Sequence, residues 1–230
     1  MSMMRLASDI EPLRSLNRLV GREAYRWRLA SLDRRRIEPP NGILLATERL
    51  EVALEGAQRL FVCAGKRVGD INAKPYLAAL RKTVRLGSPV GSASTGAYLL
   101  ALPRLLNGRR CTVHWESRPA FVDEVPEIHC TNRLYEIDGE CMTCTGLTAA
   151  MDMMLNVIVE AHGPEHAKGV ANQFHHERIC SMAEDQCNGT LGFIASLSMP
   201  MQKALALMRR NIEHPLSLPE VAKQWELSPR

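Results

Sequence analysis

A short run of small and hydroxylated residues, Ser94-Thr95-Gly96, lies between the apolar stretch Pro89 to Ala93 and the helix-forming stretch Ala97 to Leu106. In a sharp strand–turn–helix elbow of this kind, the tip residue stands above the sheet. The free N–H groups of the next helix then point toward whatever binds there. Ser94 is therefore a candidate nucleophile or part of a pocket for an anion. A capped helix after a buried strand, without a further role, explains the same residues.

Two more side chains that can do chemistry, His114 and Trp115, close the next apolar stretch, Cys111 to His114. Because α/β sheets carry their ligand sites at the ends of strands, His114 is a candidate base for Ser94. Trp115 offers an aromatic face on which a cationic ligand can sit. The alternatives are a hydrogen-bonded core histidine and a tryptophan that only packs in the core.

The pair Cys141 and Cys144 has the Cys-x-x-Cys spacing of zinc and redox sites. On a strand, however, residues three apart point to opposite faces, and no second such pair completes a tetrahedral set. His175-His176 near Cys180 forms a similarly weak cluster. We therefore expect no metal ion and no cofactor.

The composition is that of an ordinary globular chain: 230 residues, 46% hydrophobic and 23% charged. It excludes disordered, collagen-like and coiled-coil proteins, and no apolar run approaches the roughly 18 residues of a membrane span. Seven cysteines without a secretion signal indicate reduced thiols, so we expect a cytoplasmic protein without a membrane partner. A net charge of +4 permits an acidic partner such as nucleic acid without requiring one.

The elements that must position the elbow alternate between strand and helix over most of the first 180 residues. This alternation predicts an α/β fold with a doubly wound, mostly parallel sheet. The continuous apolar run Leu60 to Gly65 indicates a strand buried on both faces. The other expected strands are Tyr25–Leu29, Ile43–Ala46 and a hairpin, Leu134–Ile137 and Glu140–Cys144. The expected helices are Arg5–Leu19 (with Pro12 as a kink or a start), Ala73–Leu86, Ala149–Ala161 and Glu165–Arg178.

The C-terminal part has a different pattern. Residues 183–198 show little periodicity and are predicted to be a linker. From residue 199 to residue 230, an apolar helical stripe is followed by Ser217 and Glu220, which have the spacing of a capping box. Ser228-Pro229 then opens a further helix. The spacing predicts an incomplete, all-α helix-turn-helix in which the helix that would enter the major groove is missing.

Several stretches together resemble a known family: Phe61–Gly65, Ser94–Tyr98, Thr112–Glu116, Gln173–Ile179 and Pro215–Ala222. The chain resembles AraC/XylS-type transcriptional regulators with an N-terminal ThiJ/PfpI-like (class I glutamine amidotransferase-like) domain. It looks most similar to the GlxA-like branch, which senses small amines and amino-acid derivatives such as glycine betaine, carnitine or arginine. The resemblance implies a flavodoxin-like, amidotransferase-like sandwich over residues 1–182.

The resemblance also implies partners and a site. The partners would be a small amine or amino-acid effector and promoter DNA, and a homodimer is one expectation because such regulators are often dimers. Trp115 would contact a quaternary ammonium group, and the helix N–H groups at Thr95 and Gly96 would bind a carboxylate. Ser228 and Arg230 would contact DNA. The expected effector-binding residues are Glu11, Gly65, Ser94, Thr95, Gly96, His114 and Trp115.

Enzymes of the ThiJ/PfpI group carry a cysteine where this chain has Ser94. A serine hydroxyl needs a well-placed base to become a nucleophile, so we expect no catalysis and treat Ser94 and His114 as vestigial. Glu11 lies near the position of the assisting acid in those enzymes. The alternative is a ThiJ/PfpI-type hydrolase or amidotransferase-like enzyme that acts through Ser94 and His114.

The resemblance further implies that both ends of the chain are clipped. Relatives begin with a further apolar strand and end with the rest of two helix-turn-helix units. We therefore expect the 230-residue chain to bind its effector without binding specific DNA. A remnant that folds poorly is a third interpretation.

Overall fold

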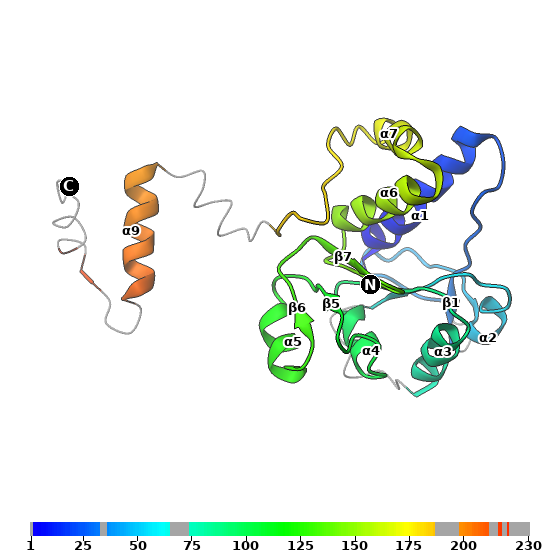
Figure 1. Ribbon diagram of the computed structural model, residues 1–230, viewed down its shortest axis with the longest axis horizontal. Helices are drawn as coiled ribbons and strands as arrows, with labels where there is room; N and C mark the ends of the chain where they lie inside the picture. Colours follow the sequence, from blue (N-terminus) through cyan, green and yellow to red (C-terminus); the bar gives the residue numbers. More distant parts are fainter. Residues whose placement is uncertain are drawn as a thin grey trace. The chain divides into compact units, whose positions relative to one another are not determined.

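The computed structural model describes residues 2–32, 36–64, 74–186, 198–211, 216–217 and 220 (Figure 1). The chain divides into two compact units, Met1–Gln186 and Cys187–Arg230. The first unit contains the elbow and the sheet, and the second contains the described part of the C-terminal tail.

The centre of the first unit is a four-stranded sheet in the order β3-β4-β8-β7. Strands β3 (Leu60–Cys63), β4 (Val90–Ala93) and β8 (Cys141–Cys144) are parallel to one another. Strand β7 (Tyr135–Asp138) is antiparallel to β8 and forms with it the hairpin predicted around Asp138-Gly139. The α/β class and the mostly parallel sheet are thus confirmed, and the hairpin adds an antiparallel edge.

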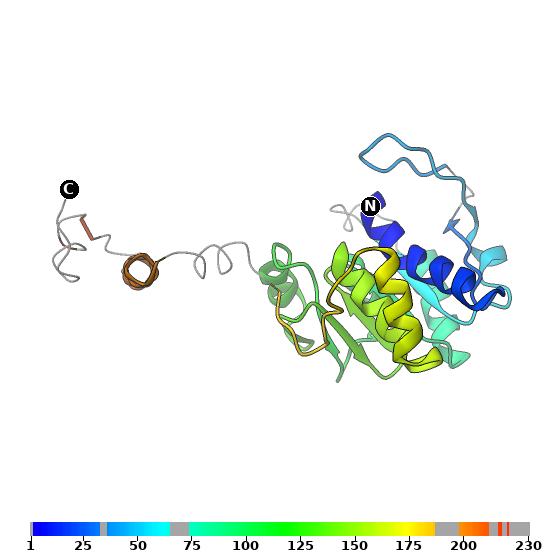
Figure 2. The same cartoon turned by 90° about the horizontal axis from the view of Figure 1, so that it is seen from above.

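Helices cover both faces of this sheet (Figures 1 and 2). On one face lie α1 (Met3–Val20), α6 (Thr148–His162) and α7 (Pro164–Gln173), which pack on one another. On the other face lie α3 (Lys74–Arg85) and α4 (Gly96–Ala101). The doubly wound arrangement predicted from the sequence is therefore present. The remaining short elements are β1 (Ala30–Ser31), β2 (Glu48–Arg49), α2 (Leu50–Ala53), β5 (Arg110–Cys111), α5 (Arg118–Glu124) and β6 (His129–Cys130).

The hydrophobic core lies on both sides of the sheet. One apolar cluster contains Leu80 and Leu100, and another contains Met153 and Ala150. Cys141 belongs to the first cluster and Cys144 to the second. The two thiols of the Cys-x-x-Cys pair therefore lie on opposite faces, as the strand periodicity predicts.

Three predicted helices agree with the structure to within a few residues: α1, α3 and α6. Helix α1 begins well before Pro12 and continues through it, so this proline does not start the helix. The helix predicted at Glu165–Arg178 is shorter and ends at Gln173 as α7, before His175 adopts a positive φ of 51°.

Two predicted strands are wrong. Tyr25–Leu29 forms no ladder, because the backbone N–H and C=O of Tyr25 are bonded by the side chain of Asn17 at 2.8 and 2.6 Å. The Ile43–Ala46 stretch contains a single bridge, between Leu45 and Ile37, and its apolar side chains are largely exposed.

Other elements differ from prediction in length or burial. Helix α4 ends at Ala101 instead of Leu106, because Pro103 has no N–H to continue it and Arg104 has a positive φ of 63°. Strand β5 stops at Cys111, since the Thr112 N–H donates to the Thr143 side chain. Strand β3 is half-buried at the sheet edge rather than buried on both faces, and the predicted residue Gly65 lies outside the described residues.

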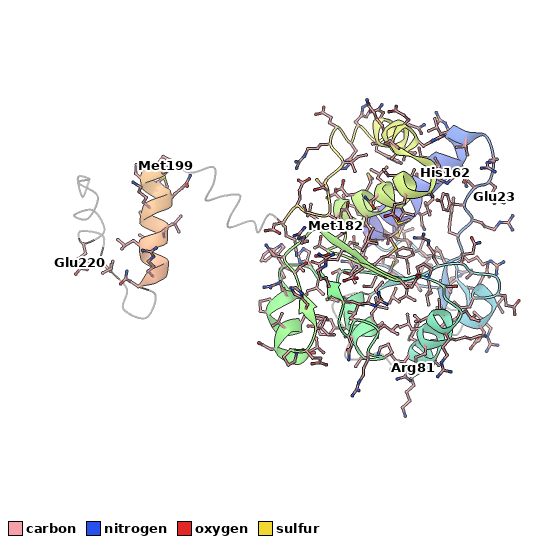
Figure 3. The ribbon with its side chains drawn as sticks, in the orientation of Figure 1. Glu23, Arg81, His162, Met182, Met199 and Glu220 are labelled. Carbon is pink, nitrogen blue, oxygen red and sulfur yellow. The ribbon has the colours of Figure 1, made fainter. Side chains whose placement is uncertain are left out.

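The segment that leaves the first unit is bonded to it through residue 186. The N–H of Leu134 donates to the carbonyl of Glu184 at 3.0 Å, and the N–H of Gln186 donates to Asn132 at 2.8 Å. The Arg133 guanidinium donates to the carbonyl of Met182, which is labelled in Figure 3. Residues 183–186, which the sequence assigns to the linker, thus lie within the first unit, and the division into 1–182, 183–198 and 199–230 stays a prediction.

In the second unit, the structure describes α9 (Met199–Arg210) and the residues Ser217 and Glu220. One half of the predicted capping box is present, because the N–H of Ser217 donates to Glu220 Oε2 at 2.7 Å; the Ser217 hydroxyl donates to the same oxygen at 2.7 Å. These bonds lower the pKa of Glu220. The rest of the predicted helix-turn-helix, including Ser228 and Arg230, lies outside the described residues. Among the described helices of both units, none has the length and apolar character required to cross a bilayer.

Candidate functional site

The predicted elbow is confirmed between β4 and α4. Ser94 has a positive φ of 56°, which is strained for a residue other than glycine, and its N–H donates to the carbonyl of Cys144 at 2.7 Å. Position 96 requires glycine, because a Cβ there would lie 2.4 Å from the carbonyl oxygen of Val62. The bend is enclosed, with Ser94 6% exposed.

The carboxyl ends of three parallel strands meet at this elbow. Strand β4 leads into Ser94, β3 leads into Ala64, and β8 leads through Cys144 to Gly146. Ligand sites of doubly wound sheets lie at this end of the strands. The site is therefore built from the elbow and from any side chain that covers these strand ends.

Arg5 of helix α1 is one such side chain. Its Nη1 donates to the carbonyl of Ala64 at 2.6 Å, and the residue is 9% exposed. Its Nε is buried and has no hydrogen-bond partner among the described residues. Gly146 leaves room for the guanidinium, since a Cβ there would lie 2.7 Å from Nε.

Asp9, one helical turn after Arg5, is the second buried charged residue at these strand ends. Its Oδ2 accepts a hydrogen bond from the Cys63 thiol at 3.4 Å, whereas Oδ1 has no partner within the described ranges. Burial raises the pKa of Asp9 to about 6, against the lowering effects of the Cys63 bond and the Arg5 charge. Burial also raises the pKa values of Cys63 and Cys144, so both thiols are protonated and poor nucleophiles.

Sequence analysis misses Arg5 and Asp9 and proposes Glu11 from the same helix. Glu11 is half-exposed and pairs with Arg14 at 2.7 Å on the surface of α1. The signal that distinguishes the two faces is helical spacing, because Arg5, Asp9 and Leu16 lie on the buried stripe of α1. A charged pair at positions i and i+4 on an otherwise buried face is the pattern that can find this site.

His114 and Trp115 lie in the turn after β5 rather than on a strand. His114 Nδ1 accepts from the Glu116 N–H at 3.4 Å, and its ring lies 5.6 Å from the ring of Trp115. No hydrogen bond joins Ser94 to His114 among the described residues, so the two do not form a nucleophile–base pair in this structure. Trp115 is 40% exposed and can offer its face to a ligand.

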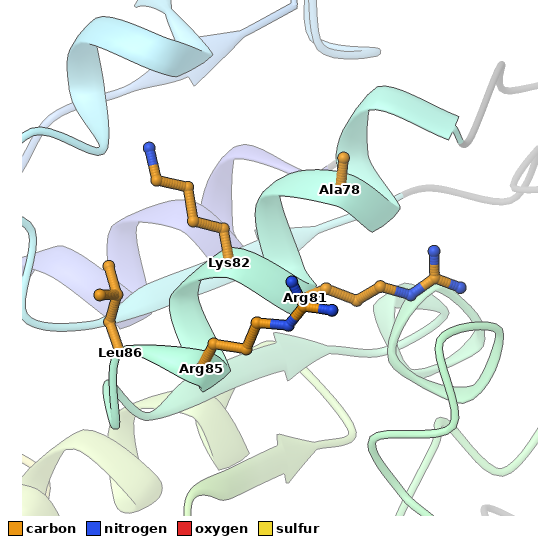
Figure 4. Close-up of a pocket in the computed structure, with 5 residues that line it drawn as sticks. All are labelled: Ala78, Arg81, Lys82, Arg85 and Leu86. Atoms are coloured by element: carbon orange, nitrogen blue, oxygen red, sulfur yellow. The ribbon is translucent and has the colours of Figure 1, made fainter.

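Two cavities open along helix α3 on the other side of the sheet. The larger, of about 420 Å³, is lined by residues of α3 and the turn after it: Ala78, Arg81, Lys82, Arg85 and Leu86 (Figure 4). The second, of about 320 Å³, is shared by α2 and α3. Figure 3 shows Arg81 at the outer edge of the first unit. Neither cavity is lined by a residue predicted to bind effector or DNA.

A doubly wound sheet with a strained serine elbow at its strand ends defines the class of this domain. The sequence pattern of the DJ-1/PfpI family matches residues 3–160, and the chain belongs to this family. The match covers α1, the central sheet and most of α6, which are the elements that build the elbow.

Curated relatives match the whole chain. It is 33% identical over 229 residues to the HTH-type transcriptional regulator GbdR of Pseudomonas aeruginosa and covers 62% of that protein. It is 34% identical over 229 residues to the HTH-type transcriptional regulator CdhR of the same species and covers 68% of it. Both matches include 100% of this chain. The chain thus spans about two thirds of the length of these relatives.

Among solved structures, the first unit is similar to an AraC family transcriptional regulator from Pseudomonas putida. The TM-score is 0.68 at 26% identity, over 75% of this chain and 93% of that one. This likeness confirms the resemblance found in the sequence. The fold and the relatives therefore point to the same group of proteins.

Proposed function

We propose that this chain is the effector-binding part of a DNA-binding transcriptional regulator that does not catalyse a reaction. One observation carries the proposal: relatives named as transcriptional regulators match all of the chain, well beyond the residues that match the DJ-1/PfpI family. A lone enzyme of this family would have no use for the helical tail from Met199 onward. The effector-bound first unit would shift the arrangement of the DNA-binding helices.

The proposed effector is a small amine or amino-acid derivative of the betaine, carnitine or arginine class. Trp115 supports this proposal, because its partly exposed ring is suited to a cation. The elbow N–H groups at Thr95 and Gly96 are proposed donors to a carboxylate, although α4 has only six residues and thus a small dipole. Ser94 and His114 complete this part of the site, with Glu11 and Gly65 as further candidates.

The remaining proposals concern partners and location. Promoter DNA would be bound in the cytoplasm by the full-length protein through the C-terminal helices, with Ser228 and Arg230 among the contacts. A homodimer is proposed on the same resemblance.

The second candidate function is a hydrolase or amidotransferase-like enzyme that acts through Ser94 and His114. The strained elbow favours it, because positive φ at a serine between a strand and a helix is typical of nucleophile elbows. The lack of a hydrogen bond between Ser94 and His114 among the described residues argues against it, since an alcohol needs a base within hydrogen-bond reach.

The deciding experiment compares a strain that expresses this chain's full reading frame with one that lacks it, before and after addition of betaine, carnitine or arginine. We expect a small set of transcripts to change only in the strain with the gene and only with one effector. In parallel, the wild-type and Ser94→Ala proteins are assayed for ester, amide and glycated-amine hydrolysis. A turnover that disappears in Ser94→Ala, without an effector-dependent transcript, would overturn the regulator in favour of the enzyme.

A further inference from the structure

Helix α1 places two opposite charges in the interior, each with an unused hydrogen-bonding atom. Arg5 Nε and Asp9 Oδ1 are buried and have no partner among the described residues. The two residues are four positions apart, so they lie on the same face of the helix. No ion pair is formed between them, although the charge of Arg5 is close enough to act on Asp9.

This pair lies at the strand ends that carry the elbow. Arg5 bonds to Ala64 at the end of β3 and approaches Gly146 beyond β8, while Asp9 bonds to Cys63. The Ser94 N–H donates to the carbonyl of Cys144 at the end of β8, so the elbow lies at the same strand ends. Two charges from a helix and an elbow from a strand thus converge at the end of the sheet where ligands bind in doubly wound folds.

Leaving these atoms unpaired costs free energy of folding. A buried donor or acceptor without a partner loses its water without replacement, and the loss is larger for charged groups. A protein that evolved only for stability would replace either side chain with an apolar one. The pair is explained if a bound molecule supplies the missing partners.

We propose that Arg5 and Asp9 bind the two charged ends of a zwitterionic effector whose cationic nitrogen carries at least one N–H. This inference rests on the proposed function and narrows its effector class to molecules with an N–H on the cationic nitrogen. At this site, Arg5 and Asp9 take the roles that the resemblance gives to the elbow N–H groups and Trp115. The Arg5 Nε–H donates to the carboxylate of the effector, and Asp9 Oδ1 accepts from the N–H of its cationic end. A fully methylated nitrogen has no N–H and leaves Oδ1 without a partner.

The site is closed in this structure, because both unpaired atoms are covered by protein. Entry of an effector therefore requires the side chains around the elbow to move. Association that requires such a rearrangement is slower than ordinary docking. Through the same rearrangement, effector binding can change the conformation of the first unit.

The test uses two matched pairs of ligands in titration calorimetry with the 230-residue chain. Arginine and agmatine differ by the carboxylate, and dimethylglycine and glycine betaine differ by the N–H. We expect the complete zwitterion with an N–H to bind at least about 30-fold more tightly than its partner in each pair that binds. Tighter binding of agmatine or of betaine would overturn the inference, as would failure of all four ligands to bind.

Variants assign each end of the ligand to its residue. Arg5→Gln should lose at least about 30-fold in affinity for arginine and change little for agmatine, while Asp9→Asn should remove the preference for dimethylglycine over betaine. Arg5→Lys, which keeps the charge, should recover part of the loss. Arg18→Gln on the exposed face of α1 and Asp123→Asn on α5 are the matched controls.

Circular dichroism and thermal melting show whether each variant is folded. If wild-type protein binds arginine or dimethylglycine and both site variants bind them equally well, the inference is wrong while the regulator proposal stands. If the transcripts do not respond to any effector yet the ligand pairs and variants behave as expected, the regulator proposal fails and the site remains.

Discussion

The first unit buries two aspartates on two helices of the same layer, and their surroundings are opposite. Asp152 of α6 is 2% exposed, and its Oδ1 accepts from His176 Nε2 at 2.7 Å and from the Cys180 N–H at 2.9 Å. Asp9 of α1 has one contact with a thiol and one oxygen with none. A buried carboxylate with two strong donors holds a structure together, whereas one without them points to a site that awaits a partner.

The segment after α7 depends on Asp152. His176 and Cys180 both bond to it, and the hydroxyl of Tyr135 donates to the carbonyl of Cys180 at 3.2 Å. The His175-His176 and Cys180 cluster noted in the sequence is therefore a structural anchor for the chain that leaves the sheet. Asp152 thus holds the segment that follows α7, whereas Asp9 lies in the part of the unit that is suited to a ligand.

The largest expected effect is a loss of stability when Asp152 is replaced. Replacing it with alanine leaves the His176 ring and the Cys180 N–H without their acceptor, and we expect a loss of about 3 kcal/mol in the free energy of unfolding. Urea denaturation followed by circular dichroism measures it. His176→Gln, which keeps a donor, should cost less than half as much. An unchanged midpoint for Asp152→Ala would show that the anchor contributes nothing.

The next effect concerns Asp9, whose substitution is expected to raise the free energy of unfolding at neutral pH. Because the folded protein raises the pKa of Asp9 from 3.8 to about 6, folding binds a proton that the unfolded chain has lost. The resulting stability is fully present below pH 4 and is lost as the pH rises through 6; the shift corresponds to about 3 kcal/mol. The groups that face this carboxyl are Arg5, Cys63 and Cys144.

Asp9→Asn should therefore be more stable than wild type by up to about 3 kcal/mol at pH 7.5, and equal to it near pH 4. Urea midpoints of both proteins between pH 4 and pH 8 measure how the difference in stability between them grows with pH. A stability difference that stays constant across this pH range would mean that Asp9 is not desolvated. A stabilised variant that has lost effector binding would be the signature of a residue kept for function at the expense of stability.

The elements predicted best are those fixed by local chemistry. Glycine after Asp138 and the flanking apolar stretches determine the β7–β8 hairpin, and the spacing of Ser217 and Glu220 determines the bond from the Ser217 N–H to the Glu220 side chain. The elbow also follows from local sequence, because the small residues Ser94-Thr95-Gly96 lie between an apolar stretch and a helix-forming stretch. These features need no knowledge of what packs against them.

The features that sequence analysis misses depend on distant partners. Tyr25–Leu29 has the pattern of a strand, but the backbone groups of Tyr25 bond to the side chain of Asn17, and the bond to β2 begins only at Leu29, whose carbonyl accepts from the Glu48 N–H. Asp9 and Asp152 are both acidic residues within helices, and only the tertiary structure shows that Asp152 has two donors whereas Asp9 Oδ1 has none in the described part of the chain. Glu11 is predicted from the family resemblance, because it lies near the assisting acid of ThiJ/PfpI enzymes, and the resemblance does not show that its side chain is on the exposed face of α1.

A smaller effect is expected at the elbow. Ser94 is held at a positive φ that costs an ordinary residue about 1 kcal/mol or more, and glycine adopts it without strain. Ser94→Gly should gain about 0.5 kcal/mol in stability, after the greater freedom of glycine in the unfolded chain is counted. Thermal melts measure this gain. Arg104→Gly, at a positive φ of 63° outside the site, is the control and should gain a similar amount.

The smallest effect concerns Glu11, the acid that the sequence places in the site. Its pair with Arg14 is exposed to solvent, so Glu11→Gln should change the free energy of unfolding by no more than about 0.5 kcal/mol, and less at high salt. Urea midpoints in low and high salt measure this change. Calorimetry on the same variant beside Asp9→Asn decides which carboxylate of α1 faces the effector. If Glu11→Gln weakens binding and Asp9→Asn does not, the contrast between a structural and a ligand-binding aspartate is wrong, and the exposed face of α1 belongs to the site.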